Sequence, residues 1–212
     1  MKRLTFILLI ACAALKVQSQ GLYLSVNPLG IMEPQAAYGL GVGYIFNDQI
    51  DVSTEFSKLS KPTWTDEGKY TNVKGFRSIS TIKITTSTDD WKLTRNFIAA
   101  ELRVKNISFD DMQDFTNIAT HATIKDFWFK NHTKSIGLAG MFGKQKYLCE
   151  SGKWILELTA GIGLKYITVT REHTPSNAVM VAKETGFGEM PNYRNDQTSF
   201  YFPLAARIIV KL

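Results

Sequence analysis

The chain has 212 residues, of which 44% are hydrophobic, 12% aromatic and 21% charged. This length suits one domain, and the aromatic content excludes an intrinsically disordered chain. The formal net charge is +6, but no basic run is interleaved with aromatic residues, so we expect no nucleic-acid partner.

The N-terminus has the pattern of a secretory signal peptide. Lys2 and Arg3 precede the apolar run of residues 4–15, and small residues at the −3 and −1 positions favour cleavage after Ser19. The apolar run is too short to cross a membrane as a helix, so an uncleaved anchor is the weaker alternative. We therefore expect residues 1–19 to be removed and residues 20–212 to form one exported domain.

The two cysteines offer little chemistry. Cys12 follows "LIA", which resembles the lipobox of lipid-modified proteins, but the residues after it continue the apolar run instead of beginning a polar tether. An ordinary signal peptide explains the same residues. Its removal leaves Cys149 alone, so we expect no intrachain disulfide.

The rest of the chain alternates between apolar and polar residues at period two, as β-strands with two different faces do. In residues 36–56 the bulky residues share one face, whereas Gly39, Gly41 and Gly43 lie on the other. Glycine serves a solvated face badly, but it fits where other groups approach closely. There are about eight such stretches, the minimum for an outer-membrane barrel. They are residues 22–27, 38–46, 50–56, 77–86, 97–105, 135–143, 154–166 and 200–212.

Charged residues of both signs share the face of the glycines. A narrow ring of strands leaves little water in its lumen, so charges there must pair and many neighbours must be small. The opposite face tolerates bulky apolar residues because lipid accommodates them. The residues expected in this lumenal charge network are Asp51, Glu55, Lys83, Glu101, Arg103, Lys105, Glu157, Lys165, Arg207 and Lys211.

Aromatic residues stand at the ends of several apolar faces. Such residues suit the girdles that flank the apolar band of a transmembrane barrel. The expected interfacial aromatics are Tyr38, Phe46, Trp154, Tyr166 and Phe202.

Short and long connections alternate along the chain. Short ones lie at residues 47–49, 87–92 and 149–153. Long ones lie at residues 28–35, 58–73, 108–132 and 171–197. This alternation is typical of outer-membrane barrels, with short periplasmic turns and long extracellular loops. An even number of strands would place both ends of the barrel in the periplasm.

The chain resembles the small, eight-stranded outer-membrane β-barrel proteins of Bacteroidota. The resemblance covers the mature chain and rests on "NPLG" after the first stretch, on "YGLGVGYIF" and on the alternating C-terminal strand. That last strand is similar to the signal read by the barrel-insertion machinery, although it ends in Leu212, where many such proteins end in an aromatic residue. The resemblance implies a membrane location and a closed barrel, and it implies no catalytic residues.

Residues that could carry catalysis or bind metal have ordinary explanations. His121, His132 and His173 fall in predicted loops without zinc-site spacing. The acidic run 110–115 lacks the glycine and final glutamate of a calcium loop, so we expect it to be a solvated loop. Glu101 and Glu157 could pair for glycoside cleavage, but lumenal salt bridges explain them better. We expect no enzyme, no metal site and no cofactor.

The sequence thus predicts an all-β protein, a closed antiparallel up-and-down transmembrane β-barrel of about eight strands. We expect a monomer in the bacterial outer membrane, surrounded by its lipid and lipopolysaccharide, with extracellular loops as the interaction surface. The sequence identifies no ligand for those loops. Two alternatives stay open: a soluble lipocalin-like carrier with its apolar faces turned inward, and a channel for small solutes.

Overall fold

The computed structural model describes residues 21–32, 36–46, 49–60, 70–89, 93–149, 151–181 and 196–212. The expected signal peptide, residues 1–19, lies outside these residues, as do residues 61–69 and 182–195 of two expected loops. Within the described ranges, no helix is long and apolar enough to cross a membrane.

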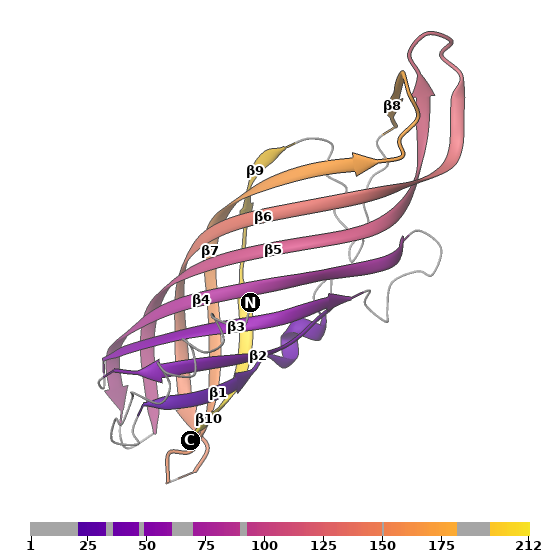
Figure 1. Ribbon diagram of the computed structural model, residues 1–212. Coiled ribbons are helices and arrows are strands. Elements are labelled where there is room, and N and C mark those ends of the chain that lie inside the picture. The colour runs from indigo at the N-terminus through magenta and orange to yellow at the C-terminus, as the bar shows by residue number, and fades with distance from the viewer. Residues whose placement is uncertain are drawn as a thin grey trace, which may run out of the picture.

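The fold is an antiparallel, up-and-down sheet in which eight strands form a ring (Figure 1). Each strand pairs with the next along the chain, and β10 pairs with both β7 and β1, which completes the ring. The all-β, up-and-down arrangement of eight strands expected from the sequence is therefore confirmed. The ring strands are β1 (Leu22–Val26), β2 (Ala36–Ile45), β3 (Ile50–Ser60), β4 (Tyr70–Asp89), β5 (Thr94–Asn117), β6 (Thr123–Tyr147), β7 (Trp154–Glu172) and β10 (Leu204–Lys211).

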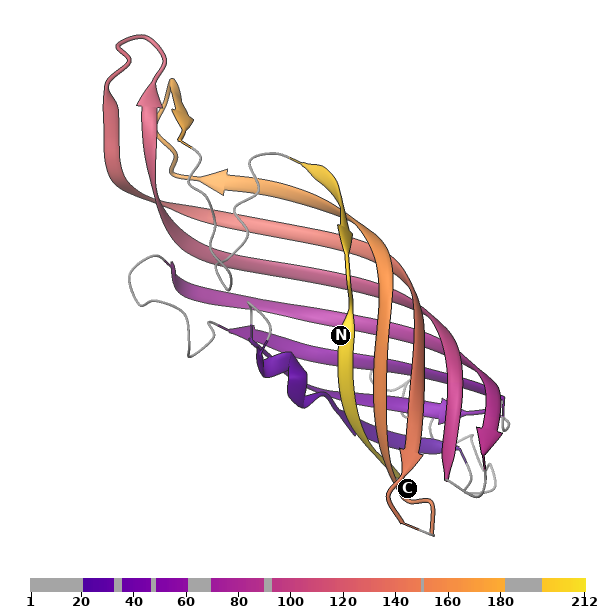
Figure 2. The same cartoon turned by 180° about the vertical axis from the view of Figure 1, so that it is seen from behind.

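Three short elements accompany the ring. The 3-10 helix η1 (Pro28–Met32) follows β1, β8 (Ala178–Met180) pairs with the far end of β5, and β9 (Gln197–Tyr201) pairs with β7. Figure 2 shows β9 and β10 running as one line beside β7. Pro203 lies between them, and the register with β7 is the same on both sides, so the proline interrupts the ladder without a bulge.

The start of β1 and the end of β10 meet at the end of the ring that carries the short connections. The backbone N–H of Leu212 donates to Leu22 O at 3.0 Å, and that of Lys211 donates to Lys153 O at 2.9 Å. Lys153 belongs to the β6–β7 turn. Both ends of the ring sequence and the short turns therefore lie together, as the even strand count requires.

The prediction of a long loop at residues 108–132 is wrong. β5 and β6 continue as a paired hairpin far beyond their neighbours and turn only at residues 118–122 (Figure 1). Asn117 tightens this turn, because its Oδ1 accepts the backbone N–H of Ala119 at 2.9 Å and of Thr120 at 3.1 Å. The acidic run 110–115 is accordingly part of β5, not a solvated loop, and His132 lies on β6.

The sequence did not reveal that β5 and β6 continue, because the large apolar residues of the hairpin move from one face of the strands to the other. From Ile98 to Val104 the large apolar residues of β5 occupy even positions and face outward, whereas Ile107 and Phe109 occupy odd positions and are buried inside. The alternation is unbroken, but its phase reverses near Asn106. Beyond that level Ile107 and Phe109 pack with Ala37 and Leu59 in a small apolar core.

The glycines of β2 make room inside the ring. Gly43 lies opposite Tyr23 in the register of β1 and β2, and the tyrosine ring occupies the space that a Cβ would need. Gly41 likewise accommodates Ser25. These contacts explain the glycine face of residues 36–46: it points into a crowded interior.

A matched pair of glycines tests this packing. A Cβ at Gly161 would meet the Gly140 carbonyl oxygen and Met141 Sδ inside the sheet, whereas a Cβ at Gly140 would meet nothing within 4 Å. We expect Gly161→Leu to lower the free energy of unfolding by about 1–3 kcal/mol through overpacking, and Gly140→Leu to leave it nearly unchanged. Urea titration of the refolded proteins measures both. Equal effects would contradict the assignment of the two faces.

Candidate functional site: a buried ionic network and an apolar belt

Glu157 on β7 is the centre of an ionic network inside the ring. Its side chain is 0% exposed, and three donors surround it. Lys83 Nζ donates to Oε2 at 2.7 Å, Gln145 Nε2 to the same oxygen at 2.8 Å, and Arg207 Nη1 to Oε1 at 3.1 Å. Such charge-assisted bonds are the strong kind, and a carboxylate without water requires them.

Arg207 extends the network to a second carboxylate. Its Nε lies 3.4 Å from Glu55 Oε2, so one guanidinium joins β7 to β3 across the ring. Glu55 also accepts from Arg77 Nη2 at 3.1 Å and from Ser57 Oγ at 2.9 Å. The planar guanidinium fork suits this bridging between two carboxylates.

Lys83 extends the network in the other direction, toward β1. Its Nζ lies 3.2 Å from Asp51 Oδ2 and 3.3 Å from the hydroxyl oxygen of Tyr23. The Tyr23 hydroxyl in turn donates to Asp51 Oδ1 at 2.7 Å. This chain of bonds ties β1, β3, β4 and β7 together from inside.

Among the residues that the structure describes, the charges of the network balance. It joins three acids (Asp51, Glu55 and Glu157) to three bases (Arg77, Lys83 and Arg207). Balance matters because an unpaired charge in so dry an interior costs several kcal/mol. A cavity of about 10 Å³ beside Asp51, Lys83 and Gln145 has room for roughly one water molecule.

The sequence identified most charges of this network and missed four members. Asp51, Glu55, Lys83, Glu157 and Arg207 were expected and lie together. The missed members are Tyr23, Ser57, Arg77 and Gln145. Arg77 has the same strand parity as Lys83, and Tyr23 the same parity as Ser25, so the alternation itself could have indicated both.

The other expected lumenal charges lie outside this cluster. Glu101 pairs with Arg103, whose Nη2 lies 2.9 Å from Glu101 Oε1. Arg103 and Lys165 both stand over the Tyr201 ring, at 5.4 and 6.0 Å from its centre. The remaining two are half-buried: Lys211 lies over the Tyr147 ring, and Lys105 sits higher on β5.

The outward face of the ring is apolar. Leu40, Leu138 and Phe142 are 65–66% exposed, in contrast to the buried charges. This arrangement is the reverse of a soluble domain, in which large apolar side chains are buried and charges exposed. The five expected interfacial aromatics are also exposed on this face: Tyr38, Phe46, Trp154, Tyr166 and Phe202.

We call this outward face the apolar belt, and polar residues bound it on both sides. On β5 it runs from Ile98 to Val104, between Asn96 and Asn106. The register partners of these two asparagines on β6 are Lys144 and Lys134. Ten residues separate the two polar levels, which is roughly 24 Å for antiparallel strands tilted by about 45°. An apolar band about 25 Å tall surrounds outer-membrane barrels.

No metal site is present in the part of the chain that the structure describes: it contains no cluster of three or more His, Cys, Asp or Glu side chains that could hold an ion. His132, which was expected in a loop, faces outward on β6 with its Nε2 3.4 Å from Glu172 Oε1. His121 and His173 lie in connections, as expected.

No protein-family model and no curated protein sequence matches this chain.

The network predicts a large cost for neutralising its centre. Glu157→Gln leaves Lys83 and Arg207 without a shared buried counter-charge, so we expect a loss of about 3–5 kcal/mol in the free energy of unfolding. Adding Lys83→Met restores charge balance and should recover part of that loss. Both are measured by urea titration.

The control is Glu172→Gln, which removes the solvent-exposed carboxylate beside His132. An exposed pair contributes at most about 1 kcal/mol. If Glu157→Gln lowered the free energy of unfolding by no more than this control, water would have to reach Glu157 inside the ring.

Proposed function

We propose that this protein is an integral β-barrel of the bacterial outer membrane whose apolar belt meets lipid. One observation carries the proposal: Leu, Ile and Phe side chains cover the outside of the ring while acids and bases fill its inside. In water this arrangement would leave large apolar surface exposed. In a bilayer it satisfies both faces, because the backbone bonds all close within the ring and lipid covers the belt.

The phase reversal on the strands supports the same proposal. Within the belt most large apolar residues face outward, and beyond it the apolar residues Leu59, Ile107 and Phe109 face inward. The outward positions there include the polar residues Lys58, Ser108 and Asp110. The same strands thus suit apolar surroundings within the belt and aqueous surroundings beyond it, and the change occurs at one level of the ring. The height of the belt agrees with the apolar band, about 25 Å tall, of outer-membrane barrels.

The interior argues against the two alternatives. A lipocalin-like carrier needs apolar side chains inside the ring to hold its ligand. The inward side chains of the ring at belt level include Glu55, Lys83, Glu157 and Arg207 instead. A channel needs a continuous aqueous path, whereas the Arg207 bridge spans the ring and the adjoining cavity of about 10 Å³ is too small to conduct solutes.

The role we propose is structural or interactive, without catalysis. The β5–β6 hairpin extends beyond the belt and carries β8 at its tip, so it would stand outside the cell as the interaction surface. The ring closes within one chain, which suits a monomer. Export by the signal peptide 1–19 and recognition of the C-terminal strand by the barrel-insertion machinery complete the proposal.

Membrane partitioning tests the proposal directly. We expect the mature chain to stay with envelope membranes at high salt and to require detergent for release, because lipid covers its belt. Unheated samples should migrate faster than heated ones in denaturing gels, since the closed ring resists detergent. Release by salt or osmotic shock alone would overturn the membrane location.

Cysteine labelling tests the orientation. Ser176 lies in the connection between β7 and β8, and Cys149 in the β6–β7 turn at the other end of the ring. In intact cells, Ser176→Cys should react with an impermeant maleimide while Cys149 stays protected. The hydrogen bond with Ser151 lowers the pKa of the Cys149 thiol and so favours its reaction. Protection would therefore come from the membrane, and permeabilised cells should label Cys149. The opposite pattern would invert the topology.

A further inference from the structure

The outer face of β6 carries three different surfaces one after another. An apolar groove lies within the belt, cations stand at the belt's edge, and a polar pocket lies beyond them. The outward residues Leu138, Ile136, Lys134, His132 and Lys130 follow each other along this one strand. This inference rests on the proposed membrane location, and its ligand has to match all three surfaces.

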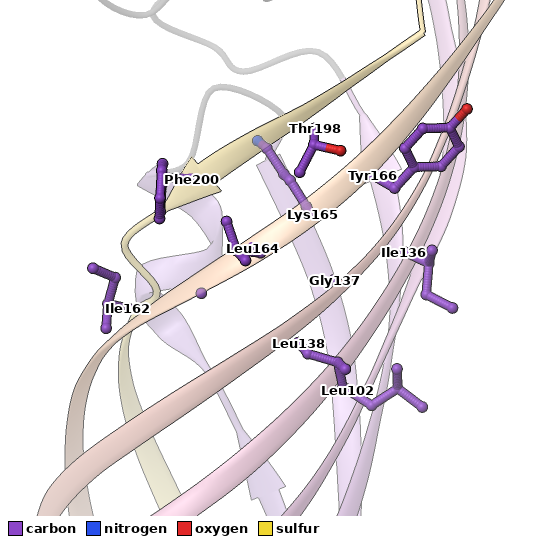
Figure 3. A pocket seen from close by; sticks show the side chains of 11 residues that line it. Leu102, Ile136, Gly137, Leu138, Ile162, Leu164, Lys165, Tyr166, Thr198 and Phe200 are labelled. Atoms are coloured by element: carbon purple, nitrogen blue, oxygen red, sulfur yellow. The ribbon is translucent and has the colours of Figure 1, made fainter.

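The groove has a volume of about 630 Å³ and is lined almost entirely by apolar side chains. Figure 3 shows Ile162, Leu164 and Phe200 along one side of it and Leu138 along the other. Tyr166, the register partner of Ile136, also lines it. A groove of this size and chemistry on a lipid-facing surface fits hydrocarbon chains.

Cations lie beyond the groove along β6 and on β4. Lys74, Ser108 and His132 lie side by side in the register of β4, β5 and β6, and Lys134 is the next outward residue of β6. Adjacent strands are about 4.8 Å apart, so the flexible side chains of Lys74 and Lys134 can converge over Ser108. Both lysines are exposed, and among the described residues neither has an ion-pair partner. Together these groups can hold a phosphate.

The pocket beyond the cations has a volume of about 550 Å³ and is lined by Thr71, Asp110, Trp128, Phe129, Lys130 and His173. Trp128 is 44% exposed and offers a flat apolar surface beside hydrogen-bonding groups. Asp110 Oδ2 accepts from Asn72 Nδ2 at 2.6 Å and would repel a phosphate. The exposed Trp128 ring can stack on the C–H face of a sugar. The neighbouring carboxylate, hydroxyl and ammonium groups of Asp110, Thr71 and Lys130 can form hydrogen bonds with the sugar hydroxyls.

The spacing of the three surfaces selects the class of ligand. Ile136 and Trp128 are eight residues apart on β6, roughly 27 Å along the strand and about 19 Å along the membrane normal at a strand tilt of about 45°. The head-group layer of a phospholipid leaflet is only about 5–8 Å deep. A phospholipid therefore does not reach from the groove to the pocket. A lipid that carries phosphates and several sugars does.

We propose that the outer face of β4–β7, together with β9, binds a phosphorylated glycolipid of the outer leaflet. Its acyl chains lie in the groove, a phosphate sits between Lys74 and Lys134, and a sugar stacks on Trp128. Glu172 stays paired with His132 beside this path and takes no part in it.

Binding to the full chain in detergent micelles, measured by native mass spectrometry, tests the proposal. The probes are a lipopolysaccharide with a short core, lipid A alone, and phosphatidylglycerol. Lys74→Gln combined with Lys134→Gln should weaken binding of both glycolipids by at least about tenfold. Trp128→Ala should weaken binding of the lipopolysaccharide and leave lipid A unchanged, because the pocket lies beyond the reach of the lipid A sugars.

The matched control is Lys144→Gln combined with Lys146→Gln, two exposed lysines at the other end of β6. This pair should leave glycolipid binding unchanged. Equal losses from both lysine pairs, phosphatidylglycerol binding as tight as that of the glycolipids, or no effect of Trp128→Ala would each overturn the proposal. A chain that inserts in membranes but shows no glycolipid preference rejects this inference alone, whereas a chain that needs no detergent rejects the membrane location as well.

Discussion

The pairing of Glu157 inside the ring governs much of the architecture. A carboxylate so completely withdrawn from water has to be met by donors, and Lys83, Gln145 and Arg207 reach it from β4, β6 and β10. Because Arg207 also binds Glu55 on β3, the bonds cross the ring instead of following neighbouring strands. The interior must stay narrow for these bonds to close, and glycine at inward positions allows it.

The inward charges on each strand fix which of its residues face outward. The strands alternate, so the residues next to an inward charge face outward, and most of them, such as Leu102 and Leu158, are apolar over the height of the belt. Above the belt the same strands place Leu59, Ile107 and Phe109 inside, and their outward positions include Lys58, Ser108 and Asp110. The large apolar residues thus change from the outer to the inner face of the strands at one level of the ring. Water on all sides would not favour this change, whereas the edge of a bilayer, under the proposed membrane location, would.

The long hairpin of β5 and β6 gives the ring its asymmetry. Its lower part carries the belt, and its upper part is a two-stranded extension with β8 paired at the tip. Since a hairpin is marginal by itself, burial of Phe109, Phe115 and Phe129 on its inner face is what supports it. The same strand, β6, thereby presents apolar, cationic and sugar-compatible surfaces in sequence, which is the basis of the proposed glycolipid site.

The sequence by itself determined the fold class, the strand faces and most of the charges inside. Period-two alternation is a local property, so Leu40 and Gly41 reveal opposite faces without any knowledge of their neighbours in space. It also led to one error: the phase reversal near Asn106 resembled the end of a strand, and residues 108–132 were expected to be a loop. Only the tertiary structure decided which inward charges meet. Register and ring closure bring Arg207 to Glu55, 152 residues away, and leave Glu101 with Arg103 instead. Such pairings depend on the shear of the whole ring, which no single strand encodes.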